Sequence, residues 1–117
     1  MLMDAAVKDL WVAALRSGTY TQTTGSLQNA YGFCCMGVLC DLYRQHVGGG
    51  WKTHETGLTL FADKAGNTCF ETCTAGVVRW AGLAGGNPKV SQKRLSEWND
   101  NEKISFQQIA NLINENL

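Results

Sequence analysis

The sequence predicts an α+β fold: one small domain, mostly helical, with about five helices and two short antiparallel β-hairpins. Several segments carry apolar residues at the spacing of one helical face. Two other segments combine β-branched or aromatic residues with nearby glycines, a pattern typical of hairpins. The chain has 117 residues, of which 44% are hydrophobic. A chain of this length and composition forms one globular domain, so we expect residues 1–117 to share one core.

The first expected helix begins near Asp4 and stops at Ser17-Gly18. Its apolar residues lie on one helical face: Met3, Val7, Leu10, Trp11 and Ala14. The stretch Thr19–Thr24 is rich in β-branched residues, and the break at Gly25-Ser26 after it predicts a short hairpin. A turn is expected at Asn29–Gly32.

The stretch from Gly32 to Leu42 contains three of the five cysteines, set among apolar side chains. It opens the second expected helix, residues 34–46, whose first half is apolar nearly all round. A helix of that kind lies in the middle of a domain. Gly32 and Gly37 have no side chain, so they would let neighbouring segments approach this helix closely.

The rest of the chain continues the alternation of hairpin and helix. In order we expect a glycine-rich loop at 48–57, a strand at 58–61, a turn at 63–67, a return strand at 68–70, and short helices at 74–81 and 91–98. Asn99–Asn101 would stop the last of these helices. A capping box at Ser105–Gln108 then starts the final helix, whose apolar face is Phe106, Ile109, Ala110, Ile113 and Leu117.

The charge balance excludes several broad function classes. Lys plus Arg equals Asp plus Glu, with 10 of each, so no overall field attracts nucleic acid or anionic lipid. No apolar run approaches the roughly 20 residues of a membrane span. The first ten residues lack the pattern of a signal peptide, and the cysteine count is odd. These features predict reduced thiols and a cytoplasmic location.

The clustered cysteines permit three interpretations. A structural zinc site needs paired spacings, whereas Cys35 and Cys40 would point about 140° apart on a helix. A thiol nucleophile needs a base, and the sequence offers only His46 and His54. Burial as small hydrophobic groups is the third interpretation and the one we expect. We therefore predict no metal, no cofactor and no catalytic residues.

Two polar groups with aromatic members are candidates for ligand binding. In an extended strand Tyr20, Gln22 and Thr24 would share one face, beside Arg16 and Thr23. The glycine-rich loop carries the second group, which comprises Trp51, Lys52 and His54. An indole beside a cation and hydroxyl groups suits a nucleotide-like ligand. An ordinary exposed hairpin and an ordinary loop would have the same composition.

The quoted segments resemble a family of small, uncharacterised phage and prophage proteins. The resemblance rests on 15–27, on the GFCCMGVLCDL stretch at 32–42, and on 77–83, 87–88, 95–100 and 105–113. It covers nearly the whole chain apart from 46–72. The resemblance implies a phage origin and carries no catalytic assignment. Small phage accessory proteins often counter bacterial defence, and several such families sequester nucleotide immune signals, usually as oligomers with a pocket between protomers.

The sequence and the resemblance together lead to one expected function. The protein would be a non-enzymatic phage protein of the host cytoplasm that sequesters a nucleotide-derived immune signal, and it could do so as a homo-oligomer. The expected ligand-binding residues are Arg16, Tyr20, Gln22, Thr23, Thr24, Trp51, Lys52 and His54. Two alternatives stay open: a protein-binding inhibitor or phage accessory protein that acts through a surface patch, and a cysteine-dependent enzyme that degrades a small signal.

Overall fold

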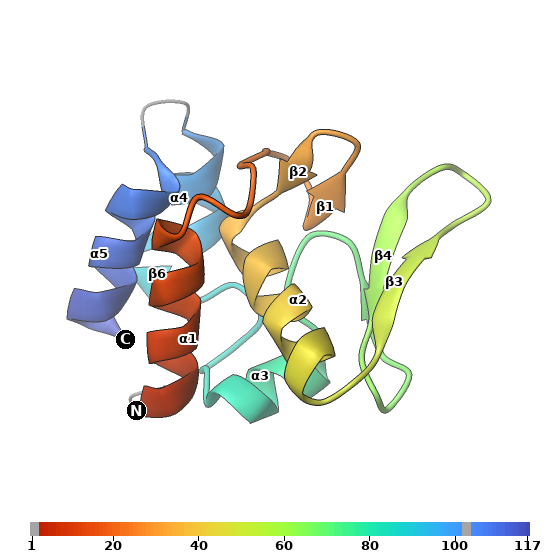
Figure 1. Cartoon of the computed structure of the whole chain (residues 1–117), viewed down its shortest axis with the longest axis horizontal. Helices are drawn as coiled ribbons and strands as arrows, with labels where there is room; N and C mark the ends of the chain where they lie inside the picture. Colours follow the sequence, from red (N-terminus) through yellow and green to blue (C-terminus); the bar gives the residue numbers. More distant parts are fainter. Residues whose placement is uncertain (1–2, 102–103) are drawn as a thin grey trace.

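Five helices and three small antiparallel sheets make up the part of the chain that the computed structural model describes, residues 3–101 and 104–117 (Figure 1). The helices are α1 (Ala5–Arg16), α2 (Cys35–His46), α3 (Ala75–Ala81), α4 (Leu95–Asp100) and α5 (Phe106–Asn116). The strands are β1 (Gln28–Asn29), β2 (Gly32–Phe33), β3 (Gly50–Thr53), β4 (Thr59–Ala62), β5 (Thr68–Cys69), β6 (Lys89–Val90) and β7 (Lys93–Arg94). The predicted α+β class is confirmed. Residues 1–2 and 102–103 of the predicted domain lie outside the described residues.

Helix α2 lies in the middle of the molecule, as its composition predicts. Every residue from Cys35 to Tyr43 is buried. Helices α1, α3 and α4 all pack against α2. In Figure 1 α1 and α5 lie side by side on one flank of α2, and the β3–β4 hairpin extends on the other. A continuous buried run of this kind is possible only because neighbours cover α2 on several sides.

The segment before α2 crosses it at backbone distance. A Cβ atom on Gly37 would overlap the carbonyl oxygen of Leu27, and one on Gly32 would overlap that of Thr21. The Leu27 carbonyl accepts a hydrogen bond from Cys34 N at 3.0 Å, at the start of α2. The predicted close approach at both glycines is therefore confirmed, and it places residues 20–27 over the first turn of α2.

The first hairpin is not the one that the sequence predicts. Residues 19–24 do not pair across Gly25-Ser26; the hairpin is β1–β2, around the turn expected at 29–32. The earlier segment instead runs beside Phe33, which donates its backbone N–H to Thr21 and accepts from Thr23, both at 2.8 Å. Its side chains explain the difference, since Tyr20 and Gln22 hydrogen bond to α2 and α4 rather than facing a strand partner.

Two other elements differ from the prediction. Part of the expected loop at 48–57 is strand β3, which pairs with β4 and places Trp51 opposite Phe61 in a three-stranded sheet. The expected helix at 91–98 is instead a β6–β7 hairpin followed by the shorter α4. Ser91 and Gln92, with φ of 50° and 74°, form the tight turn of that hairpin, and two such angles are incompatible with a right-handed helix.

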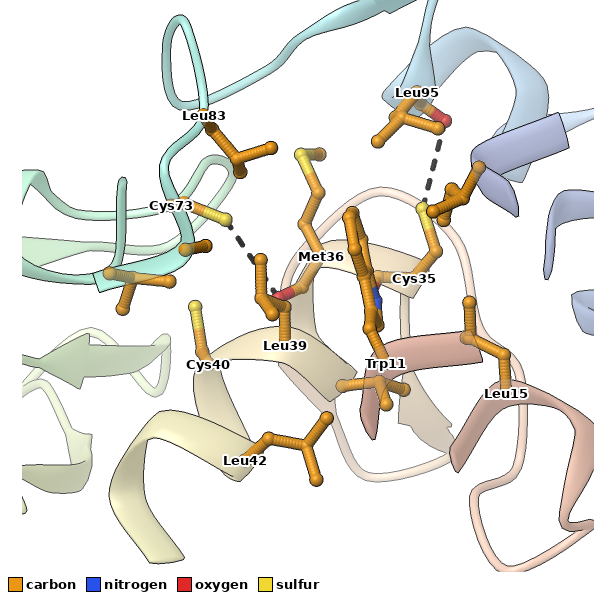
Figure 2. Packing of buried hydrophobic residues seen from close by; sticks show 14 of the residues in the cluster. Trp11, Leu15, Cys35, Met36, Leu39, Cys40, Leu42, Cys73, Leu83 and Leu95 are labelled. Atoms are coloured by element: carbon orange, nitrogen blue, oxygen red, sulfur yellow. Dashed lines mark hydrogen bonds between the residues drawn. The ribbon is translucent and has the colours of Figure 1, made fainter. Parts of the chain in front are cut away.

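One hydrophobic core joins the helices to the sheets (Figure 2). Trp11 is fully buried between α1 and α2, and its indole N–H donates to the Cys35 carbonyl at 2.9 Å. Cys35, Cys40 and Cys73 lie within the same cluster, with Cys40 and Cys73 close together in Figure 2. The thiols therefore occupy core positions that small apolar side chains would otherwise fill.

Candidate functional site

The Asp41 carboxylate lies where the two predicted polar groups meet. The Tyr20 hydroxyl donates to its Oδ2 at 2.6 Å, and the Trp51 indole N–H donates to its Oδ1 at 3.0 Å. Arg44 Nε and Gln45 Nε2 donate from the next turn of α2 at 2.8 and 3.1 Å. Asp41 is only 6% exposed. A buried carboxylate needs several donors to remain ionised, and these four supply them.

Hydrogen bonds and burial in this network keep Asp41 ionised and Tyr20 protonated. Burial alone would raise the pKa of Asp41, but hydrogen bonds from Arg44, Tyr20 and Trp51 outweigh it and lower that pKa below its usual value. Burial and the bond to Asp41 raise the pKa of Tyr20 to about 12. At neutral pH Tyr20 is therefore a donor and Asp41 an acceptor, and the network positions side chains rather than transferring protons.

Edge-to-face ring contacts hold Trp51 in place. Its ring lies 4.9 Å from that of Phe61 and 5.8 Å from that of Phe33, measured between centroids. Phe33 in turn contacts Tyr20 at 5.0 Å. Trp51 thus has its N–H bonded to Asp41 and its ring packed against two phenylalanines. Trp51 therefore helps to fix Tyr20, because both residues hydrogen bond to Asp41 and both rings contact Phe33.

An open groove brings three of the predicted ligand residues together. It has a volume of about 370 Å³, and we call it the Arg16 groove; its lining is Leu15, Arg16, Gly18, Tyr20, Gln22, Ser105, Phe106 and Gln107. It lies between the end of α1, the segment that follows it, and the start of α5. No carboxylate is among the lining residues, so the charge that Arg16 contributes is not neutralised within the groove.

Arg16 and the first turn of α5 supply the hydrogen-bond donors of this groove. One guanidinium nitrogen of Arg16, Nη2, donates to Asn111 Oδ1 at 2.7 Å, which ties its position to α5. The predicted capping box is confirmed, with Ser105 and Gln108 bonded reciprocally. It leaves the backbone N–H groups of Phe106 and Gln107 without an acceptor among the described residues. Such free N–H groups at a helix start favour an anion.

The other predicted residues lie away from the groove. Thr23 is fixed by its backbone, since its carbonyl accepts from Asn99 Nδ2 at 2.8 Å. Thr24 is exposed but does not line the groove. Lys52 and His54 are exposed on the β3–β4 hairpin, where His54 Nδ1 lies 3.0 Å from the Thr56 hydroxyl. The structure therefore separates the second polar group from the first, apart from the link through Trp51.

Sequence reasoning missed Asp41 and Asn99, two buried polar residues that organise the site. Asn99 is 1% exposed; its Oδ1 accepts from Cys35 N at 3.0 Å and from Gln22 Nε2 at 3.3 Å. It thereby bonds to the first turn of α2 and orients Gln22. Asp41 could have been found from the sequence, because it is a lone carboxylate within the apolar run of α2 and a buried charge must have hydrogen-bonding partners. Asn99 carried no comparable signal, since asparagine beside aspartate is typical of any helix end.

The cysteines of α2 are placed as core groups. Burial raises the pKa of the Cys34 thiol to about 12 and that of Cys35 well above its usual value. Of the histidines, His46 stacks on Trp80 and His54 lies on the β3–β4 hairpin. Across residues 3–101 and 104–117, no three His, Cys, Asp or Glu side chains gather as a metal ion would require. The half-buried Cys69 differs: burial would raise its pKa, but hydrogen bonds from Thr72 and nearby backbone lower it.

Fold and site together define a small α+β domain with a cation-lined groove beside a buried carboxylate network. The family model described as "Domain of unknown function (DUF8296)" matches residues 3–117, and the chain belongs to that family. No curated protein and no solved structure matches the chain significantly. None of the helices in the described residues is long and apolar enough to cross a membrane.

Proposed function

We propose that this protein is a non-enzymatic binder that sequesters a small, phosphate-bearing, nucleotide-derived ligand in the Arg16 groove. One observation carries the proposal: Arg16, Tyr20 and Gln22 line one groove together with the start of α5, whose first backbone N–H groups have no acceptor among the described residues. A guanidinium and helix N-terminal amides are two of the donor types that recognise phosphate in proteins.

The phosphate contacts would come from Arg16 and from the start of α5. Arg16 uses Nη2 for Asn111, which leaves its remaining N–H groups for a ligand oxygen. Phe106 and Gln107 also line the groove, and their backbone N–H groups would donate to the same anion. The ligand's negative charge is favoured further because no carboxylate lines the groove. The bond to Asn111 reduces the entropy that Arg16 loses on binding.

The remaining surface suits a heterocycle. The Tyr20 ring is fixed by its hydroxyl bond to Asp41 and by its contact with Phe33, and a fixed ring is a good stacking surface. Gln22 donates its amide N–H groups to Ile104 O and Asn99, so its carbonyl oxygen can accept from an exocyclic amine. Asp41, Trp51 and Asn99 act as positioning residues behind this surface.

The biological setting follows from the resemblance to phage and prophage proteins. The ligand would be a bacterial immune signal, bound in the host cytoplasm and removed from its receptor. The groove volume of about 370 Å³ lies at the lower end of ligand sites, which span about 300–1,000 Å³. A mononucleotide-sized portion fits, and a larger signal would need a second copy of the chain to cover the rest.

Thermal unfolding with a panel of cyclic dinucleotides, ADP-ribose derivatives and mononucleotides tests the proposal. A ligand at 100 times its Kd adds about 2.7 kcal/mol to the free energy of unfolding, which raises the Tm of a domain this size by on the order of 10 °C. Arg16→Gln should abolish the shift. Lys52→Gln removes a cation outside the groove and should leave it unchanged. No shift with any member of the panel, or equal loss in both variants, would contradict the proposal.

The two alternatives make different predictions. A protein-binding inhibitor would co-purify with a host protein and show no shift with any small ligand. A cysteine-dependent enzyme would need a reactive thiol at Cys34 or Cys35, and both are buried with raised pKa values. The placement of these two thiols therefore favours binding over thiol catalysis at α2.

A further inference from the structure

A second open groove lies between the end of α2, helix α3 and the β4–β5 turn. Its volume is about 350 Å³, and we call it the Trp80 groove; its lining includes Tyr43, Val47, Lys64, Gly76, Arg79 and Trp80. None of these residues lines the Arg16 groove. The two grooves are therefore separate sites, and nothing in the proposed function uses the second.

Fixed aromatic rings form the apolar part of the Trp80 groove. The Trp80 ring contacts Tyr43 edge to face at 5.6 Å and stacks with His46 at 6.2 Å, with 24° between the ring planes. Tyr43 is held by Phe61 at 5.9 Å, and its hydroxyl accepts from the Lys64 backbone N–H at 3.2 Å. The Trp80 ring is therefore held in place before a ligand arrives, so little entropy is lost when a flat ligand stacks on it.

Trp80 alone among the four tryptophans keeps a free indole N–H. The indole nitrogens of Trp11, Trp51 and Trp98 donate to Cys35 O, Asp41 and Val90 O. Trp80 Nε1 has no acceptor within residues 3–101 and 104–117. An amphipathic indole usually finds a partner for its N–H when the ring is packed, so this donor is available to a ligand.

Two cations without partners border the same rings. Neither the Lys64 ammonium nor the Arg79 guanidinium has an ion-pair or hydrogen-bond partner in the described part of the chain. No acidic side chain lines the groove. The nearest carboxylate in sequence, Asp63, is 4% exposed and accepts from the backbone N–H of Gly76 at 2.8 Å and of Asn67 at 2.9 Å. The groove thus combines an apolar floor with two cations that lack a partner among the described residues, while the Asp63 carboxylate next to Gly76 is bonded to backbone donors.

We propose that the Trp80 groove is a second binding site, for a small amphipathic anion with a flat apolar body and one acidic group. The body would stack on Trp80, whose ring is held by Tyr43, and the acidic group would lie between Lys64 and Arg79. The Trp80 N–H would donate to an acceptor on the ligand. Charge complementarity excludes a cationic ligand, and the volume suits a molecule of one or two fused rings.

Nuclear magnetic resonance of the ¹⁵N-labelled protein tests this site with naphthalene-2-sulfonate as the probe. Trp80→Phe removes one indole resonance and so assigns it. Addition of the sulfonate should shift that resonance and leave those of Trp11 and Trp98 in place. The uncharged naphthalene-2-sulfonamide, which has the same ring, should bind roughly tenfold more weakly because it lacks the charge.

Charge variants then locate the acidic group. Lys64→Gln with Arg79→Gln should weaken sulfonate binding by roughly tenfold or more, whereas the matched pair Lys52→Gln with Lys89→Gln should not. All four positions are exposed, so the variants retain the fold. Arg16→Gln should leave sulfonate binding intact, which separates this proposal from the proposed function. An unmoved Trp80 resonance, equal affinity for sulfonate and sulfonamide, or equal effects of the two charge pairs would overturn the proposal.

Discussion

Asp41 shows how one buried charge can organise residues from three separate segments. Its carboxylate accepts from Tyr20, Arg44, Gln45 and Trp51. Tyr20 and Trp51 are half-buried, so without Asp41 their donors would depend on water at a partly buried position. Because the bonds are charge-assisted, they are roughly twice as strong as neutral ones. The network therefore fixes the Tyr20 ring, which forms one side of the Arg16 groove.

Asp41→Asn should destabilise the protein by about 2–3 kcal/mol, because an amide removes the charge and puts a donor where two donors already point. Urea unfolding measures this loss. Asp9→Asn, an exposed change on α1, is the control and should lie within about 0.5 kcal/mol of the parent.

The pH dependence of stability provides an independent check of this prediction. The pKa of Asp41 is lowered in the folded protein from its usual 3.8. Its stabilising contribution is therefore present above about pH 4 and is lost as the pH falls through the folded pKa. Asp41→Asn should lose less stability than the parent between pH 5 and pH 3. Parallel losses in the two proteins would contradict the assigned role of the carboxylate.

Among the secondary-structure elements, Gly37 allows the segment before α2 to pack against that helix at backbone distance. A glycine inside a helix costs about 1 kcal/mol relative to alanine, so Gly37 would be a poor choice if helix propensity alone mattered. Its use follows from the carbonyl of Leu27, which occupies the space of a Cβ atom. That contact holds residues 20–27 against α2 and thereby places Tyr20 and Gln22.

Gly37→Ala should destabilise the protein by about 2–3 kcal/mol in spite of the better helix propensity, since the new methyl group meets backbone that cannot move aside easily. Gly50→Ala is the matched control, because no atom lies within 4 Å of a Cβ built there. Thermal unfolding should show a large loss of Tm for the first variant and little change for the second. A stabilised Gly37→Ala protein would show that the crossing segment is not in close contact.

Across the whole molecule, the five cysteines differ in burial. Cys34, Cys35, Cys40 and Cys73 are buried around α2, whereas Cys69 lies half-buried at the end of the β3–β4–β5 sheet. Reactivity follows thiolate content and access. The fold therefore separates the buried cysteine-rich stretch from Cys69, the half-buried thiol that reagents can reach.

Iodoacetamide at neutral pH should label Cys69 first and leave Cys34 and Cys35 unmodified in the folded protein. Burial raises the pKa of both α2 thiols, while hydrogen bonds lower that of Cys69. Mass spectrometry after timed labelling measures the order, and labelling in urea should reach all five. Rapid labelling of Cys34 or Cys35 in the folded state would instead support the cysteine-dependent enzyme.

The fold class, the central buried helix and the close approach at Gly32 and Gly37 are predictable from the amino-acid sequence alone. Each of these rests on short-range information: helical spacing, side-chain size and turn residues. The last helix, with its capping box at Ser105–Gln108, was predictable for the same reason, and so was the turn at 29–32.

Which polar residues meet depends on contacts between segments that are distant in sequence. Arg16 and Tyr20 share a groove with α5 because α1 and α5 pack together, a contact between residues as distant in sequence as Arg16 and Asn111. Strand β3 forms because Trp51 pairs with Phe61 on β4. Residues 19–24 do not form a hairpin strand because the side chains of Tyr20 and Gln22 hydrogen bond to Asp41 and Asn99. Such long-range hydrogen bonds and ring contacts override local β propensity, and no local pattern records them.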